Sequence, residues 1–183
     1  MNIEEFFLKS VGEWNSMRSG HTLAFQEFEE IRSRIKITPA KSRDSRVTKL
    51  LKENLLTTDE GKKAFLINWD AESEWNEENQ NENLSGESIL IPIQISKAEG
   101  KIIRSVGYSE AIQVISRYKF LDDGTLVIHS NYKNFCTEER IWFLSNNLRS
   151  RSSVTKSINS LAILQTSYAS EIRIIKNQLD IKQ

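Results

Sequence analysis

The chain of 183 residues carries 25 lysine and arginine residues against 25 aspartate and glutamate residues, so its formal net charge is zero. This length suits one domain with a substantial core, and the balanced charge argues against a nucleic-acid-binding surface. No apolar run reaches the roughly eighteen residues of a membrane-spanning helix, and a single cysteine excludes an internal disulfide framework. The acidic N-terminus lacks the basic start and apolar core of a signal peptide, so we expect an intracellular protein.

Two short amphipathic helices are predicted in the first third of the chain. Asn2 followed by Glu5 resembles a capping box, and apolar residues then recur at helical spacing until Gly12. We expect this helix to cover one end of the structure that follows it. A second helix of about three turns is predicted from Asp44 onward, because apolar residues recur at helical spacing as far as Leu55.

Most of the remaining chain is predicted to be β-strand. Residues 30–38 alternate between isoleucine or serine on one face and arginine or lysine on the other, which indicates a strand with one face in solvent. Further runs rich in β-branched and aromatic residues predict strands over 12–19, 65–69, 89–95, 102–108, 111–121, 125–132 and 161–175. Residues 76–87 are rich in asparagine and glutamate and predict a flexible polar loop.

The strand count and the short connections set the fold class. The predicted strands and a hairpin over 136–154 give about eight to ten strands in total, and no βαβ alternation occurs among them. This pattern predicts a mainly β, antiparallel, meandering sheet. A sheet this long normally curls and closes. We therefore predict one domain over 1–183 that forms an up-and-down β-barrel of the calycin or lipocalin type, with a central cavity and the two helices outside the strand pattern.

The hairpin over 136–154 has its turn at Ser-Asn-Asn, and Arg149 and Arg151 share one face of its second strand. Two registers are open. A two-residue loop would pair Arg149 with Leu144. A loop one residue longer would pair Arg149 with Ser145 and turn both arginines to the face of the acidic residue in the first strand.

The second register would place Glu139 and the two arginines on one barrel wall among aromatic residues. Such a wall suits a ligand with carboxylates at one end and weakly basic nitrogens at the other. The alternative is an exposed face of charge pairs, which would say nothing about function.

The sequence Glu139-Arg-Ile-Trp-Phe, followed by Asn147-Leu-Arg-x-Arg-x-Ser, resembles the signature hairpin of the S-type phycobiliprotein lyases, which are CpcS/CpeS-like. These proteins attach open-chain tetrapyrroles, the bilins, to cysteines of light-harvesting phycobiliproteins. Weaker similarities lie in Gly12-x-Trp-x-Ser-x-Arg, in the following Leu23-Ala-Phe, and in the closing Ser170-Glu-Ile-Arg. The resemblance implies a fatty-acid-binding-protein-like barrel, in agreement with the strand count.

The resemblance also implies site residues. Glu139 would be the acid–base residue, with Arg149 beside it in the catalytic pair. Arg149, together with Arg151 and Arg18, would bind the two propionates of the bilin through bidentate hydrogen bonds. From spacing alone, we would instead expect Arg18 to form an ion pair at a rim.

Three tryptophans, Trp69, Trp75 and Trp142, would provide flat walls for the chromophore. Glu171 and Arg173 follow as further ligand-binding candidates in a supporting position. Two charges this close on one strand are more often a surface pair than a site.

The partners follow from the same resemblance. The substrate would be a bilin such as phycoerythrobilin or phycocyanobilin, handed over by a bilin reductase, and the acceptor an apo-phycobiliprotein subunit of the β type. We expect no cofactor and no metal, because His21 and His129 cannot form a metal site by themselves. We expect neither a nucleic acid nor a membrane as partner, and whether the chain forms a homodimer stays open. The location would be a cyanobacterial or infected-host cytoplasm, or the plastid of an alga.

Two other functions stay open. A non-catalytic carrier of a bilin, haem or fatty acid would need one clamp and apolar walls, but it would not need Glu139. A structural assembly protein would not need arginines that face inward. Cys136 is interpreted as a small hydrophobic residue rather than as a nucleophile.

Overall fold

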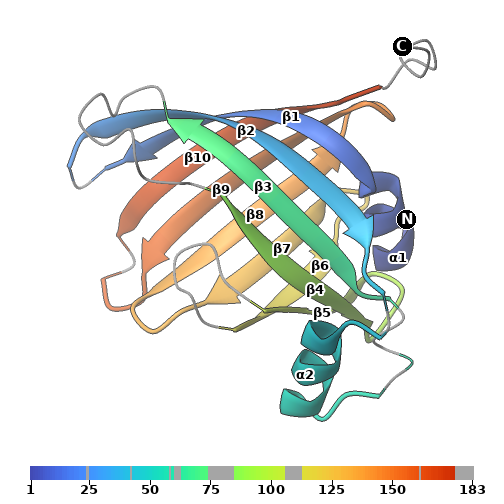
Figure 1. Ribbon diagram of the computed structural model, residues 1–183. Coiled ribbons are helices and arrows are strands. Elements are labelled where there is room, and N and C mark those ends of the chain that lie inside the picture. The colour runs from blue at the N-terminus through green and yellow to red at the C-terminus, as the bar shows by residue number, and fades with distance from the viewer. Residues whose placement is uncertain are drawn as a thin grey trace.

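Antiparallel strands close into a single barrel in the computed structural model of the protein (Figure 1). The structure describes residues 1–23, 25–41, 43–57, 59, 63–73, 85–105, 113–160 and 162–175. The strands within these ranges are β1 (Gly12–Thr22), β2 (Glu27–Pro39), β3 (Phe65–Ser73), β4 (Gly86–Gln94), β5 (Glu99–Arg104), β6 (Val114–Phe120), β7 (Leu126–Asn131), β8 (Phe135–Phe143), β9 (Leu148–Ser157) and β10 (Ile163–Arg173). The helices are α1 (Ile3–Ser10) and α2 (Ser45–Glu53).

The sheet follows the chain order throughout. Each strand pairs with the next one, and β1 pairs with both β2 and β10, which closes the barrel. Closure leaves neither β1 nor β10 as an exposed edge. The predicted mainly β, up-and-down barrel of the calycin or lipocalin type is therefore confirmed.

Some predicted strand limits are wrong. The strand β5 begins at Glu99 rather than at 102, because its pairing with β4 outweighs the low strand propensity of Glu99 and Gly100. The strand β4 begins at Gly86, so the last two residues of the predicted loop over 76–87 belong to a strand. The rest of that loop up to residue 84, and residues 106–112 at the ends of two predicted strands, lie outside the described residues.

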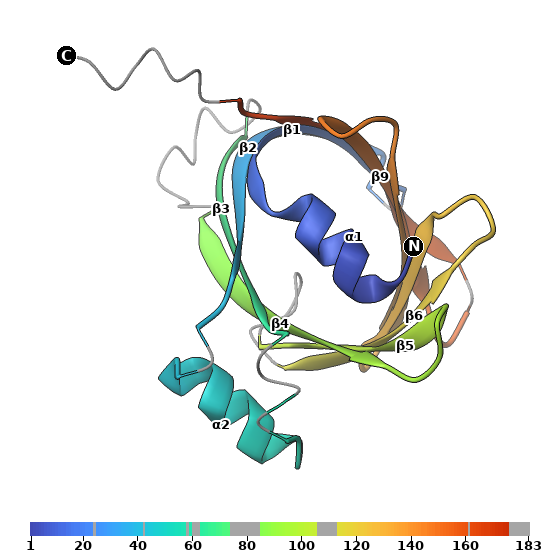
Figure 2. The same cartoon turned by 90° about the vertical axis from the view of Figure 1, so that its right-hand side faces the viewer.

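The helix α1 closes one end of the barrel. Asn2 and Glu5 form the predicted capping box, which fixes where the helix starts. Phe6 and Phe7 then pack into the barrel core together with Trp14, whose indole Nε1 donates to the Ser10 carbonyl at 2.8 Å. Figure 2 shows α1 lying across the opening of the ring of strands. The prediction that this helix covers one end is confirmed.

The helix α2 lies outside the ring of strands (Figure 2). Its buried residues Val47, Leu50 and Leu51 pack in one cluster with isoleucines of β4 and β5. The helix ends at Glu53, and Leu55 then takes a left-handed backbone conformation with φ of 54° and is 95% exposed. The prediction that Leu55 belongs to the apolar face is therefore wrong. Within the described residues, neither helix is long and apolar enough to cross a membrane.

Candidate ligand-binding cavity

The hairpin of β8 and β9 turns two arginines into the barrel. Its pairing joins Phe143 to Arg149, Ile141 to Arg151 and Glu139 to Ser153. Because side chains alternate along a strand, the two arginines share the inner face with Glu139. Of the two alternatives, only the longer loop turned both arginines to the face of Glu139, and this facing is the one observed.

The register itself differs from both predicted alternatives. Arg149 pairs with Phe143 rather than with Leu144 or Ser145, because the turn takes in residues 144–147. The hydrogen bonds from the amides of Leu144 and Ser145 to the Leu148 carbonyl close this longer turn. The difference from the longer-loop alternative is two residues, and a shift of two leaves every side chain on its face.

Five buried or half-buried charged side chains meet on the inner wall, and we call them the arginine–glutamate cluster: Arg104, Glu139, Arg149, Arg151 and Glu171. Arg104 Nη2 donates to Glu139 Oε2 at 3.0 Å, and Arg149 Nε donates to Glu171 Oε2. Arg151 lies between the two acids, with its Nη1 3.7 Å from Glu139 Oε1 and its Nε 3.7 Å from Glu171 Oε1. Four strands contribute to this network, β5, β8, β9 and β10.

The electrostatics of the cluster favour an anionic ligand. Burial by itself would raise the pKa of the Glu171 carboxyl, but the charges of Arg151 and Arg149 outweigh it and hold that pKa below its ordinary value. Glu171 is therefore ionised at neutral pH. Among the described residues, the cluster consists of three arginines and two glutamates, so a carboxylate ligand would meet several guanidinium groups at this wall.

The cluster adjoins a cavity of about 400 Å³ in the barrel interior. Cavities that bind cofactors and drug-sized ligands have volumes of about 300–1,000 Å³. One wall is apolar and includes Ile35 of β2 and Trp69 of β3. The opposite wall carries hydroxyl groups that are bonded in pairs, Thr137 with Thr155 at 3.0 Å and Ser153 with Ser167 at 2.7 Å.

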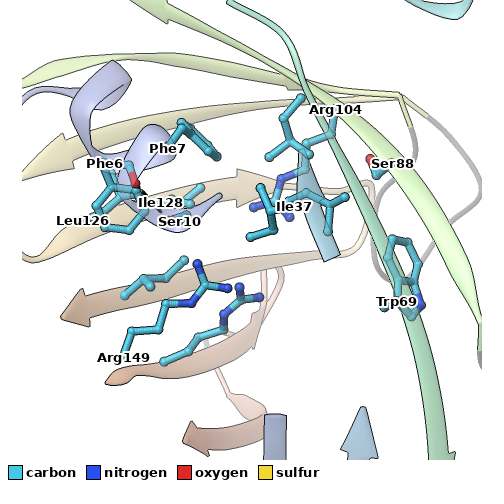
Figure 3. Close-up of a pocket in the computed structure, with 14 residues that line it drawn as sticks. Phe6, Phe7, Ser10, Ile37, Trp69, Ser88, Arg104, Leu126, Ile128 and Arg149 are labelled. Carbon is cyan, nitrogen blue, oxygen red and sulfur yellow. Dashed lines mark hydrogen bonds between the residues drawn. The ribbon is translucent and has the colours of Figure 1, made fainter. Parts of the chain in front are cut away.

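A smaller space of about 40 Å³ continues from this cavity toward α1. It shares Trp69 and Arg149 with the larger cavity and ends against Phe6 and Phe7. Figure 3 shows Arg104 and Arg149 reaching toward this space from different strands, with Phe6 and Phe7 on one side and Trp69 on the other. The helix therefore forms the closed end of the cavity.

Two of the other predicted residues also line the cavity. Trp69 lies on β3 opposite Gly86, where a side chain larger than hydrogen would overlap the indole, so the glycine provides the space for the ring. Arg18 lines the outer part of the cavity, and its Nη2 lies 3.3 Å from Glu29 Oε2 with both side chains partly exposed. Arg18 thus combines the pocket position and the rim ion pair that were considered for it. Trp75 lies outside the described residues.

Two predicted ligand-binding residues are placed elsewhere. Trp142 alternates with Ile141 and points out of the barrel, where its ring lies 6.3 Å from that of Tyr168. The expectation that Trp142 forms a wall of the cavity is therefore wrong. Arg173 donates from Nη1 to the Val11 carbonyl, and from Nη2 to the Lys9 carbonyl at 2.6 Å. It fastens the end of α1 to β10 instead of facing the ligand space.

Glu171 lies closer to the ligand space than its sequence pattern indicated. It is almost fully buried in the cluster and does not form a surface pair with Arg173.

Arg104 is a cluster residue that the sequence analysis missed. It follows Ile102 at a spacing of two in an apolar strand, and that spacing places a charge on the same inner face as a core residue. A charged residue on a core face signals a buried partner.

Comparisons with known proteins point to one protein family. The model of the family described as CpeS-like protein matches residues 2–174. The chain is 38% identical over 175 residues to chromophore lyase CpcS/CpeS 3 of Trichodesmium erythraeum, a match that covers 94% of this chain and 99% of that protein. It is 35% identical over 176 residues to chromophore lyase CpcS/CpeS of Thermosynechococcus vestitus, covering 95% and 93% of the two proteins.

A solved structure matches as well. The S-type phycobiliprotein lyase CPES from Guillardia theta superposes with a TM-score of 0.83 at 32% sequence identity, covering 97% of this chain and 95% of that one. Rv2717c from M. tuberculosis matches with a TM-score of 0.56 at 8% identity, which shows a shared fold and nothing further.

Proposed function

Since the chain belongs to the CpeS-like family of chromophore lyases, we propose that it is a bilin lyase that acts on a phycobiliprotein. It binds an open-chain tetrapyrrole in the barrel cavity without a covalent bond. It then directs thioether attachment of that bilin to a cysteine of an apo-phycobiliprotein subunit of the β type. The bilin comes from a bilin reductase, and the reaction takes place in the compartment where phycobiliproteins are assembled, which is the cytoplasm of a cyanobacterium or of an infected host, or the plastid of an alga.

The observation that carries this proposal is the arginine–glutamate cluster beside a cavity of about 400 Å³. A bilin has two propionates and four pyrrolic nitrogens on a flat, largely apolar frame. Arg149 and Arg151 face the cavity and would bind a propionate, each charge-assisted hydrogen bond contributing about 1.5–3 kcal/mol where water is excluded. Arg18 at the outer part of the cavity would take a second carboxylate.

Glu139 is the residue best placed to act on the pyrrole nitrogens. Its carboxylate lies on the cavity wall between Arg104 and Arg151, and these contacts hold it in one orientation. It would accept hydrogen bonds from pyrrole N–H groups and so favour the protonated, more electrophilic tetrapyrrole. Trp69 and the isoleucines of the apolar wall would keep the frame extended.

The covalent step is an addition. The thiol sulfur of the acceptor forms a bond to the ethylidene carbon of the bilin, and the thiol proton ends on the tetrapyrrole. The step therefore needs no oxidant, leaving group or cofactor. The thiol belongs to the acceptor protein, because Cys136 alternates with the cavity residue Thr137 and lies on the outer side of β8. The lyase contributes by fixing which face of the bilin the thiol meets.

A three-component assay tests the proposal. The chain is mixed with phycoerythrobilin and an apo-phycobiliprotein β subunit, and the acceptor is examined for a zinc-fluorescent covalent band after denaturation. We expect a shift of the bilin spectrum on binding and a band well above that of the mixture without the chain. A non-catalytic carrier would give the spectral shift without the additional band, and that result would contradict the lyase.

A pair of variants locates the ligand. Arg149→Ala should weaken bilin binding, whereas Arg140→Ala, which removes an exposed arginine on the outer side of β8, should not. Spectral titration with bilin measures both affinities. Equal affinities for the two variants would remove Arg149 from the ligand site.

A further inference from the structure

Three turns lie side by side at the end of the barrel opposite α1. Their described residues are 23, 25 and 26 between β1 and β2, 132–134 between β7 and β8, and 158–160 and 162 between β9 and β10. The Leu23 amide donates to the Leu164 carbonyl at 2.9 Å, and the Ile158 amide donates to the Asn134 carbonyl at 3.1 Å. These bonds tie the three turns into one continuous rim, and Figure 1 shows the β1–β2 turn at the end of the barrel away from α1.

Apolar side chains stand exposed along this rim, and we call them the mouth crest: Leu23, Phe25, Phe28, Ile158 and Ile163. Phe25 at the tip of the β1–β2 turn is 75% exposed. Turns are normally built from small or polar residues, because their side chains meet water. Here Leu23, Phe25 and Ile158 lie in the turns, and Phe28 and Ile163 lie at the adjoining strand ends. Large apolar residues at such positions instead indicate a surface that another molecule covers.

The mouth crest borders the only end of the cavity that the described residues leave uncovered by a helix. The cavity residues Arg18 of β1 and Gln165 of β10 lie on strands that lead to the crest. Arg18 is five residues before Leu23, and Gln165 is two residues after Ile163. Phe6 and Phe7 of α1 fill the other end. A thiol on a second protein that enters from this end, on the side of these three turns, would pass the crest.

Charged residues at the two edges of the crest would favour one orientation of a bound partner. Glu27 is exposed on the β2 side, and Lys133 and Lys156 are exposed on the side of β8 and β9. A partner surface with an apolar centre, basic groups at one edge and acidic groups at the other would fit in one orientation and not in the reverse one.

We propose that the mouth crest is the docking surface for the acceptor phycobiliprotein subunit, an assignment that rests on the lyase function proposed above. Docking buries Phe25 and Leu23 against an apolar patch beside the acceptor cysteine. The cysteine thiol is then held over the opening while the bilin stays bound below. The crest takes no part in binding the bilin itself.

The test compares a crest variant with a matched control. The crest variant is Leu23→Ser with Phe25→Ser, and the control is Leu144→Ser, which alters a leucine that is 59% exposed in the turn at the closed end. Attachment of phycoerythrobilin is measured in single turnover over a range of apo-subunit concentrations. We expect bilin affinity to stay unchanged in both, and the half-saturating acceptor concentration to rise about tenfold or more in the crest variant alone.

The outcomes separate this proposal from the one before it. Equal half-saturating acceptor concentrations for wild type and the crest variant would overturn the docking surface, while the lyase function stands. Failure of the wild type to bind bilin or to label the acceptor would overturn the lyase function itself.

A cross-linking experiment tests the docking surface without the serine variants, so its result does not depend on whether they fold. A photoreactive phenylalanine analogue placed at position 25 should cross-link to the acceptor subunit, and the same analogue at position 144 should not. Cross-links from position 25 only to a second copy of the chain would overturn the assignment and make the crest a self-association surface.

Discussion

Replacing Arg149 with methionine should destabilise the fold by a predictable amount. Arg149 is 2% exposed and Glu171, which accepts a hydrogen bond from its Nε, is 1% exposed, so the variant leaves a buried carboxylate without this hydrogen-bonded arginine. Breaking one side of a buried pair costs about 3–5 kcal/mol. Arg151 Nε still lies 3.7 Å from the Glu171 carboxylate and offsets part of the loss. We therefore expect a loss near the lower limit, about 3 kcal/mol.

Thermal unfolding followed by circular dichroism measures this loss. For a chain of this size, about 3 kcal/mol corresponds to a fall in Tm of about 6–12 °C. The exposed Arg140 provides the control, since Arg140→Met should change stability by no more than about 0.5 kcal/mol. The double variant Arg149→Met with Glu171→Leu removes the stranded carboxylate as well and should recover more than half of the loss.

Two results would refute this reasoning. One is an Arg149→Met variant that is as stable as Arg140→Met, which would mean that the ion pair with Glu171 contributes nothing. The other is a double variant that is less stable than Arg149→Met, which would mean that Glu171 acts through contacts other than those with the arginines.

The remaining predictions concern the ligand and pH. Glu139→Gln should bind bilin with unchanged affinity but attach it about 100-fold more slowly, and a wild-type single-turnover rate would exclude an acid–base role. Trp69→Ala should weaken bilin binding about tenfold in a spectral titration, while Trp142→Ala on the outer wall should not; equal effects would contradict the placement of the two rings. The pKa of Glu171 lies below its ordinary value of 4.5, so its contribution to stability is complete above the ordinary pKa and is lost as the pH falls through the lowered one. Between pH 6 and pH 3 the Tm of the wild type should therefore fall more than that of the double variant without Arg149 and Glu171, and parallel curves would contradict this assignment.

Alternation along single strands predicted much of the candidate site. Within β2, β8 and β9, alternation showed which residues share a side, such as Arg149 with Arg151. That both arginines lie inside together with Glu139 depended on the turn as well. The exact register was not predictable, because it depends on the geometry of the turn. The longer-loop alternative placed the arginines on the correct face although its register was wrong. The observed pairing differs from it by two residues, which is the period of a strand.

Contacts between residues on distant strands of the closed barrel could not be predicted from the sequence. Arg104 meets Glu139 only because closure brings β5 and β8 around the same interior, and the two residues are 35 positions apart. Arg173 binds carbonyls more than 160 positions away, so its role in holding α1 has no local signal.

Trp142 shows which rule holds when two disagree. The family resemblance suggested that it lines the ligand space, but it is the neighbour of Ile141, which shares a side with Glu139, and alternation was not applied to it. The structure follows the alternation. The strand pattern is the stronger rule because one buried face fixes every second side chain of that strand.

A structure of the chain with phycoerythrobilin bound would test the central claim most directly. We predict the tetrapyrrole inside the barrel, with a propionate on Arg149 or Arg151, its nitrogens toward Glu139 and one face against Trp69. A bilin bound on the outer wall, or one inside whose propionates point to solvent while the arginine–glutamate cluster keeps only its own contacts, would contradict it.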